Sequence, residues 1–263
     1  FSEFLAEADS KLYAYLNSMD RIELIPDIFF HPLVDKLKMY YISGGMPEAI
    51  VTLLENQDVG QTQQVLQNIL NAYTLDFSKH VENKNIPKIN YIWASLSSQL
   101  ARENKKFLYQ SVKQGARARE YEDALLWLIN AGLAYRIYCS TKPSLPLSAY
   151  DDLSAFKIYL PDVGLLRRLS LLDPTAIVEG NRLLTEFKGA LTENYILESL
   201  LQQFEGVPRY WKSENMAEVD FLVQYRNEII PIEVKADENI RSKSLTFFRK
   251  QYNPRISIRY SLR

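Results

Sequence analysis

Two apolar segments near the C-terminal end of the chain carry ionisable residues at strand spacing. The segments are 218–223 and 230–236, and they contain Asp220 and the pair Glu233 and Lys235, respectively. Because side chains alternate faces along a strand, Glu233 and Lys235 should point the same way, with Asp220 opposite them if the strands pair as a hairpin. Unpaired charge is costly to bury, so such a cluster usually has a partner such as a metal ion.

The elements that must position these residues can be predicted from apolar spacing. The pattern predicts a helix, a first strand, the two strands just described, a second helix and a last strand; the outer elements cover 189–201, 208–212, 242–252 and 255–260. With Glu193 on the first helix, this order resembles the core of the PD-(D/E)XK nucleases. We therefore expect a restriction-endonuclease-like αβββαβ domain with a mixed sheet over residues 180–263.

The resemblance implies a catalytic set of Glu193, Asp220, Glu233 and Lys235. Carboxylate oxygens are the ligands that hard divalent cations prefer, so the implied cofactor is Mg²⁺ or Mn²⁺. Asp220 and Glu233 would hold the metal with the carbonyl of Val234, and Glu193 would bind a second metal or position a metal-bound water. Lys235 would stabilise the charge of the phosphorane or lower the pKa of the attacking water. A Glu-x-Lys pair on a strand is also the spacing of an ordinary ion pair.

The composition is that of an ordinary globular protein. The 263 residues are 47% hydrophobic and 24% charged, and the net charge of -1 argues against a uniformly basic protein that coats nucleic acid. No apolar run reaches the roughly 18 residues of a membrane span, so no membrane partner is expected. The single cysteine, Cys139, excludes an internal disulfide and is typical of a reducing compartment. We expect a cytoplasmic protein.

Positive charge gathers in two segments of the chain. Residues 242–263 contain no Asp or Glu, and residues 102–119 contain only Glu103. The cations of the first segment are Lys243, Arg249, Lys250, Arg255, Arg259 and Arg263, and those of the second are Arg102, Lys105, Lys106, Lys113, Arg117 and Arg119. Each segment is either a surface that faces phosphates or a solvated helix face.

The rest of the chain predicts two further regions. Apolar residues at helical spacing predict a mainly helical region over 1–85. Over 86–172, helices are followed by strands predicted at 134–139 and 156–160 with a proline-rich turn between them, which is the order of a winged helix. A linker is predicted over 173–184. The expected class is α+β, with a helical region, a winged-helix-like module and the nuclease-like domain.

Several segments taken together resemble the C-terminal region of a large prokaryotic family of predicted AAA-type ATPases. They are 1–5, 41–48, 121–133 and 156–166, together with the catalytic set described above. In that family an N-terminal P-loop ATPase precedes a domain of unknown function similar to PD-(D/E)XK nucleases. This chain has no G-x-x-x-x-G-K-S/T motif, so ATP is expected to bind only in an N-terminal domain that the chain lacks.

These features lead to one expected function and two alternatives. The first is a metal-dependent DNA endonuclease coupled to the ATPase domain of the same protein. The second is DNA binding without cleavage, in which the winged helix and the basic C-terminal segment hold the nucleic acid. The third is a regulatory or assembly module of the ATPase. The intact catalytic set favours the first, and the near-neutral net charge favours the third.

Overall fold

The structure, a computed structural model, describes residues 1–102, 105–179, 185–214, 217–236 and 242–262. The chain divides into two compact units, each made of two separate segments. The helical unit comprises Phe1–Ile86 and Asp162–Thr185, and the sheet unit comprises Pro87–Pro161 and Glu186–Arg263. In the part of the chain that the structure describes, no helix is long and apolar enough to cross a membrane.

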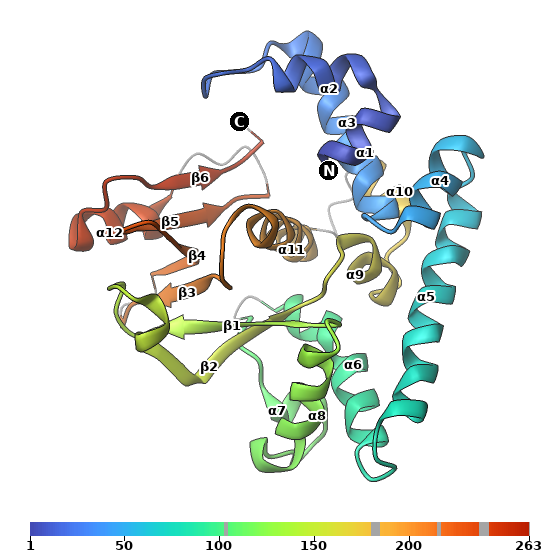
Figure 1. Ribbon diagram of the computed structural model, residues 1–263, viewed down its shortest axis with the longest axis vertical. Coiled ribbons are helices and arrows are strands. Elements are labelled where there is room, and N and C mark those ends of the chain that lie inside the picture. The colour runs from blue at the N-terminus through green and yellow to red at the C-terminus, as the bar shows by residue number, and fades with distance from the viewer. Residues whose placement is uncertain (103–104, 180–184, 215–216, 237–241, 263) are drawn as a thin grey trace. The chain divides into compact units, whose positions relative to one another are not determined.

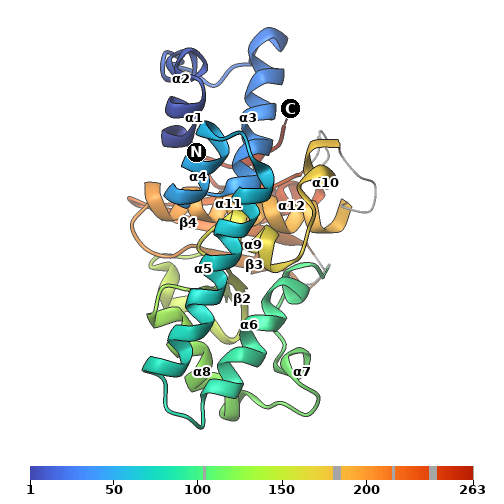
Figure 2. The same cartoon turned by 90° about the vertical axis from the view of Figure 1, so that its right-hand side faces the viewer.

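Helices alone build the described part of the helical unit. They are α1 (Ser2–Ala8), α2 (Ser10–Asn17), α3 (Asp27–Ser43), α4 (Pro47–Glu55), α5 (Val59–His80), α9 (Val163–Leu169) and α10 (Pro174–Glu179). The short helix α9 packs against α3 and α5 (Figures 1 and 2). The predicted helical character of this part of the chain is confirmed.

The first half of the linker predicted over 173–184 contains a helix, and the domain boundary placed there stays a prediction. Residues 174–179 form α10, and Pro174 occupies its first position, where a residue without an N–H is tolerated. Asp173 supports this start, because its carboxylate accepts a hydrogen bond from the backbone N–H of Thr175 at 2.8 Å. Residues 180–184 lie outside the described residues.

A buried carboxylate joins the two chain segments of the helical unit. Asp162 accepts hydrogen bonds from the backbone N–H groups of Gly45, at 2.6 Å, and Leu165, at 2.8 Å, and so caps the N-terminus of α9. Gly44 has a φ of 67°, and a Cβ there would lie 2.1 Å from Oδ1 of Asp162. Only glycine fits both the positive φ and the close carboxylate. Residues 44–45 of the segment 41–48 and residues 162–165 of the segment 156–166 therefore meet here as structural partners.

Gly164 marks the closest approach of the two backbones. A Cβ on Gly164 would lie 2.5 Å from the backbone nitrogen of Gly44, where no flexible side chain can absorb the clash. Gly164→Ala is therefore expected to lower the free energy of unfolding by about 2 kcal/mol in urea titrations. Gly189→Ala is the matched control, because its Cβ would meet only the Lys105 ammonium group at 3.8 Å. An equal loss in both variants would refute this reading.

The sheet unit is a mixed α+β structure around one six-stranded sheet with the order β2-β1-β3-β4-β5-β6 (Figure 1). Its strands are β1 (Tyr135–Ser140), β2 (Asp151–Tyr159), β3 (Arg209–Lys212), β4 (Glu218–Tyr225), β5 (Glu228–Val234) and β6 (Ile258–Tyr260). Its helices are α6 (Ile86–Leu100), α7 (Tyr109–Val112), α8 (Ala118–Asn130), the short η1 (Leu147–Tyr150), α11 (Thr185–Gln203) and α12 (Lys243–Tyr252). The pairs β1–β3 and β5–β6 are parallel, and the other neighbours are antiparallel.

The predicted α+β class and the predicted mixed sheet are confirmed. Helix α11, strands β3 to β5, helix α12 and strand β6 follow one another in the expected α-β-β-β-α-β order. The hairpin β1–β2 extends the same sheet, because Cys139 and Ser140 of β1 pair in parallel with β3. A separate winged-helix-like module over 86–172 is not confirmed, and the boundaries 1–85, 86–172 and 180–263 stay predictions.

Helix α12 packs on the sheet through an apolar cluster. Phe248 is 1% exposed and contacts Trp211, with ring centroids 5.1 Å apart and the ring planes nearly perpendicular. Leu147, Val219 and Leu222 complete the buried cluster. This packing fixes the start of α12 close to the end of β5, where two of the predicted site residues lie.

Candidate functional site

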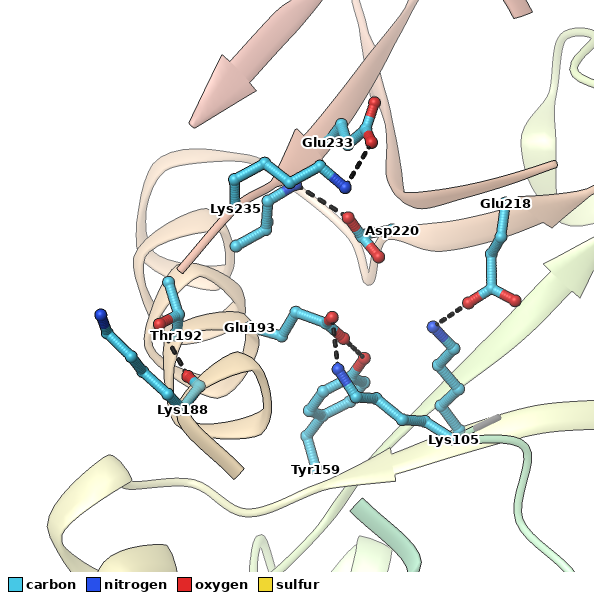
Figure 3. Close-up of polar contacts among 11 residues, drawn as sticks. Lys105, Tyr159, Lys188, Thr192, Glu193, Glu218, Asp220, Glu233 and Lys235 are labelled. Carbon is cyan, nitrogen blue, oxygen red and sulfur yellow. Dashed lines mark hydrogen bonds and ion pairs between the residues drawn. The ribbon is translucent and has the colours of Figure 1, made fainter. Parts of the chain in front are cut away.

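The predicted site residues reach the same region of the sheet unit from one helix and two strands (Figure 3). Glu193 lies on α11, Asp220 on β4 and Glu233 near the end of β5, and Lys235 directly follows β5. Strands β4 and β5 pair as the predicted hairpin, with Phe221 opposite Ile232. As expected from strand alternation, Glu233 and Lys235 are in contact, with 2.7 Å between Oε1 and Nζ. We call this group the acidic site.

Glu193 is a buried carboxylate with two protein partners. Its Oε1 lies 2.5 Å from Nζ of Lys105, and its Oε2 accepts a hydrogen bond from the Tyr159 hydroxyl at 3.0 Å. Burial raises the pKa of Glu193, but the charges of Lys105 and Lys157 outweigh burial, so the pKa is lower than usual. Glu193 is therefore ionised at neutral pH, and its charge is balanced by lysines.

Asp220 is the carboxylate whose charge is least compensated. Its Oδ2 accepts a hydrogen bond from the backbone N–H of Val234 at 2.8 Å. Burial and the neighbouring Glu193 charge raise the pKa of Asp220 to about 7, against the opposing effect of Lys157. Two carboxylates that compete for limited positive charge cannot both ionise easily. Asp220 therefore takes up or releases a proton near neutral pH.

Glu233 holds the start of helix α12. It is 2% exposed, and its Oε2 accepts hydrogen bonds from the Ser242 hydroxyl and from the backbone N–H of Leu245, the latter at 3.1 Å. Ser242 is the N-cap residue of α12, so the carboxylate satisfies an otherwise free amide of the first turn. Because Oε1 pairs with Lys235, both oxygens of Glu233 have protein partners.

Lys157 is a fully buried cation beneath the acidic site. Its Nζ lies 2.5 Å from Oε1 of Glu218 and 4.8 Å from the centre of the Tyr210 ring. Burial alone would lower the pKa of Lys157, but the acidic groups around it raise the pKa well above its ordinary value; they are Tyr159, Glu218, Glu193 and Asp220. Lys157 therefore stays charged and offsets part of the negative charge above it.

Asp220 and Glu193 are the carboxylates that could offer oxygen to a hard divalent cation, although Lys105 and Tyr159 already contact the two oxygens of Glu193. Mg²⁺ often uses one or two carboxylates while keeping several waters. Across the described residues, no group of three or more His, Cys, Asp or Glu could hold a metal ion. The predicted ligand Glu233 is engaged by α12 and Lys235, and Val234 contributes an N–H to Asp220. The predicted four-part metal site stays a prediction.

Sequence reasoning missed Lys105, Lys157 and Tyr159 as neighbours of the acidic site. Lys105 and Glu193 are 88 residues apart in sequence, and Lys157 and Glu218 are 61 apart. One local signal was present, because Lys157 interrupts the otherwise apolar run 155–160. A lysine within a buried strand requires a nearby negative partner.

The basic segment 242–263 exposes several of its cations on helix α12. Helix α12 exposes Lys243, Arg249 and Lys250. Arg249 and Lys250 line a shallow hollow of about 320 Å³. Arg255 pairs with Glu228 at 3.0 Å, and Arg263 lies outside the described residues. The exposed cations of α12 are therefore available to an anionic partner.

Comparison with known families gives two matches along the chain. The model of a family described as Domain of unknown function (DUF8612) matches residues 34–176. The model of a second, Domain of unknown function (DUF4143), matches residues 188–262, and this family is commonly found in AAA-ATPase-associated proteins. The chain matches no curated protein and no solved structure. The acidic site lies in the second matched region, and its neighbours Lys105, Lys157 and Tyr159 fall in the first.

Proposed function

We propose that this chain, which belongs to the family described as Domain of unknown function (DUF8612), cleaves phosphodiester bonds of DNA with the help of a divalent cation. The observation that carries the proposal is the pairing of Asp220 with Glu193. Burial and the neighbouring Glu193 charge raise the pKa of Asp220 to about 7, so the charge of Asp220 is not fully compensated. A divalent cation would supply the missing positive charge. Strongly perturbed carboxylates are typical of functional sites.

The residues of the chain take distinct roles in this proposal. Glu193 and Asp220 would hold the cation, and Glu233 orients Lys235 through their ion pair. When bound, Mg²⁺ or Mn²⁺ would polarise the phosphodiester and make a water more acidic. Lys235, whose side chain is 32% exposed, can donate to a phosphate oxygen that gains charge in the transition state. The α-β-β-β-α-β order of the elements supports a restriction-endonuclease-like assignment.

The substrate and the partner domain are part of the same proposal. The exposed cations of α12, Lys243, Arg249 and Lys250, would contact the DNA backbone, because such contacts position a duplex without reading its sequence. The match of residues 188–262 to a family commonly found in AAA-ATPase-associated proteins supports coupling to an ATPase domain.

The test is cleavage of supercoiled and single-stranded DNA by this chain in the presence of Mn²⁺. Activity should fall by roughly 10²-fold or more in Lys235→Ala, because a positioned charge at the transition state is lost. Lys212→Ala, which removes an exposed lysine of the same unit, should retain activity.

Each alternative result has a distinct meaning. Wild-type protein that binds neither Mn²⁺ nor DNA would overturn the proposal and favour a regulatory or assembly role. Protein that binds DNA but cleaves neither substrate would favour the non-catalytic binding role. Equal cleavage in wild type and Lys235→Ala would remove the proposed site from the reaction.

A further inference from the structure

A second concave surface of the sheet unit lies apart from the proposed cleavage residues. Its residues come from the segment that contains α7, from the start of α8, and from β1 and β2 (Figure 1). The hollow has a volume of about 870 Å³. None of the catalytic set lines it. A hollow of this size can take a small organic ligand.

Arg136 is the unusual residue of this hollow. Its side chain is 9% exposed and its Nη1 donates to Glu122 at 2.7 Å and to the Tyr138 hydroxyl at 2.9 Å. Its Nε and Nη2 are buried, and neither has a hydrogen-bond partner within the described residues. Buried donors without acceptors are costly, especially on a charged group. Arg136 therefore has two donors that no acceptor among the described residues uses, and a ligand would reach them once a side chain that covers them moves.

Aromatic rings form the walls around Arg136. The guanidinium carbon lies 4.5 Å from the centre of the Phe156 ring, and Phe107 stacks on Phe156 at 5.5 Å. Tyr109 and Tyr138 also line the hollow and meet Phe156 edge to face. Phe107 and Phe156 are buried, so the rings that can meet a ligand are those of the half-buried Tyr109 and Tyr138. A ring beside a cation suits a planar aromatic group attached to an anion.

The charge at the rim favours an anion. The lining residues include Lys106, Arg117, Arg119 and Arg136 but one carboxylate, Glu122. Arg117 and Arg119 are exposed and stand at the start of α8, whose first-turn amides also favour negative charge. Part of the basic segment 102–119, whose role the sequence left open, is thus gathered around one hollow.

We propose that this hollow binds a nucleotide, with its base against the rings of Tyr109 and Tyr138 and its phosphate on Arg136, Arg117 and Arg119. The nucleotide is either free or part of a single strand, since both present the same base and phosphate. Base stacking on aromatic side chains next to a basic groove is the usual way to hold such a unit. The assignment does not rest on DNA cleavage at the acidic site.

The test measures binding in EDTA, so that metal-dependent cleavage plays no part. The probe is a fluorescein-labelled oligonucleotide of about ten thymidines, a length near the site size of common single-strand binders, followed by anisotropy. Arg136→Met and the double variant Arg117→Ala/Arg119→Ala should each weaken binding about tenfold or more. The double variant should also reduce the dependence of affinity on salt. Lys212→Ala, an exposed lysine outside the hollow, should bind as the wild type does.

Arg136 is buried and paired, so Arg136→Met could lose binding because it misfolds. A further variant that leaves Arg136 in place therefore tests the hollow independently. Ala118→Trp fills the hollow from an exposed position at the start of α8 and removes no charge, and it should also abolish binding. Competition by thymidine 5′-monophosphate would identify a free nucleotide as sufficient; loss of binding in the variants without such competition would identify a strand. Wild-type protein that binds neither probe, or variants that all bind normally, would overturn the proposal.

Discussion

Asp220→Asn is expected to lower cleavage by about 10³-fold and, at the same time, to stabilise the protein, most strongly above pH 7. In the folded chain the pKa of Asp220 is raised to about 7 from an ordinary value of 3.8 by burial and by Glu193. The folded state thus binds the proton more tightly than the unfolded state. The stability that this proton contributes is complete below about pH 4 and is lost as the pH rises to about 7.

Asparagine removes the titration and keeps the acceptor, because its amide oxygen can still receive the N–H of Val234. At pH 8 the variant should therefore exceed the wild type in unfolding free energy by roughly 1–3 kcal/mol, and at pH 5 by less. Cleavage should fall by about 10³-fold, a loss in the range seen when an essential electrostatic group is removed. A gain in stability with a loss of activity is typical of a functional residue that lowers the stability of the folded protein.

Urea titrations at pH 5 and pH 8 measure the stability effect, and the Mn²⁺ assay measures the activity. Asp152→Asn is the matched control, because hydrogen bonds from Ser154 lower the pKa of Asp152. That control should gain nothing at pH 8. If Asp220→Asn changed stability equally at both pH values, the raised pKa would be refuted. If it retained full activity, Asp220 would have no part in the reaction.

Local periodicity was enough to predict the strand part of the acidic site. Alternation along β5 put Glu233 and Lys235 on one face, and their contact at 2.7 Å follows from it. The β4–β5 hairpin and the helix that carries Glu193 were also predictable, because each rests on neighbours in sequence. The predicted metal-binding roles, in contrast, remain proposals.

The features that the sequence did not predict depend on contacts between residues that are far apart in the chain. The second function of Glu233, as an acceptor for the first turn of α12, depends on where α12 starts in space. The extension of the sheet by β1 and β2 depends on a parallel pairing between residues about 70 positions apart, such as Cys139 and Tyr210, for which no local pattern exists. The contacts of Lys105 with Glu193 and of Lys157 with Glu218 are long-range in the same way. Hydrophobic spacing predicts faces of elements, not partners across them.

Lys157→Met should move the pH dependence of cleavage upward by about one unit, the size of shift that a nearby charge commonly causes. Lys105 and the fully buried Lys157 both act to lower the pKa of Glu193 and of Asp220, and Lys157 has the larger effect on Asp220. Without Lys157, Asp220 should ionise at a higher pH. The variant should also lose roughly 2–4 kcal/mol of stability, because Glu218 and the acidic site lose a buried counter-charge, and the loss should be larger at pH 8 than at pH 5.

Glu218→Gln separates these effects. It removes the direct ion-pair partner of Lys157, at 2.5 Å, but leaves the lysine charge beneath the acidic site. Its cleavage profile should therefore not move upward, although its stability should fall. Profiles of initial rate against pH, from pH 5 to pH 9, compare the two variants with the wild type. A shift of the same sign and size in both would mean that the ion pair itself, and not the charge of Lys157, sets the ionisation of Asp220.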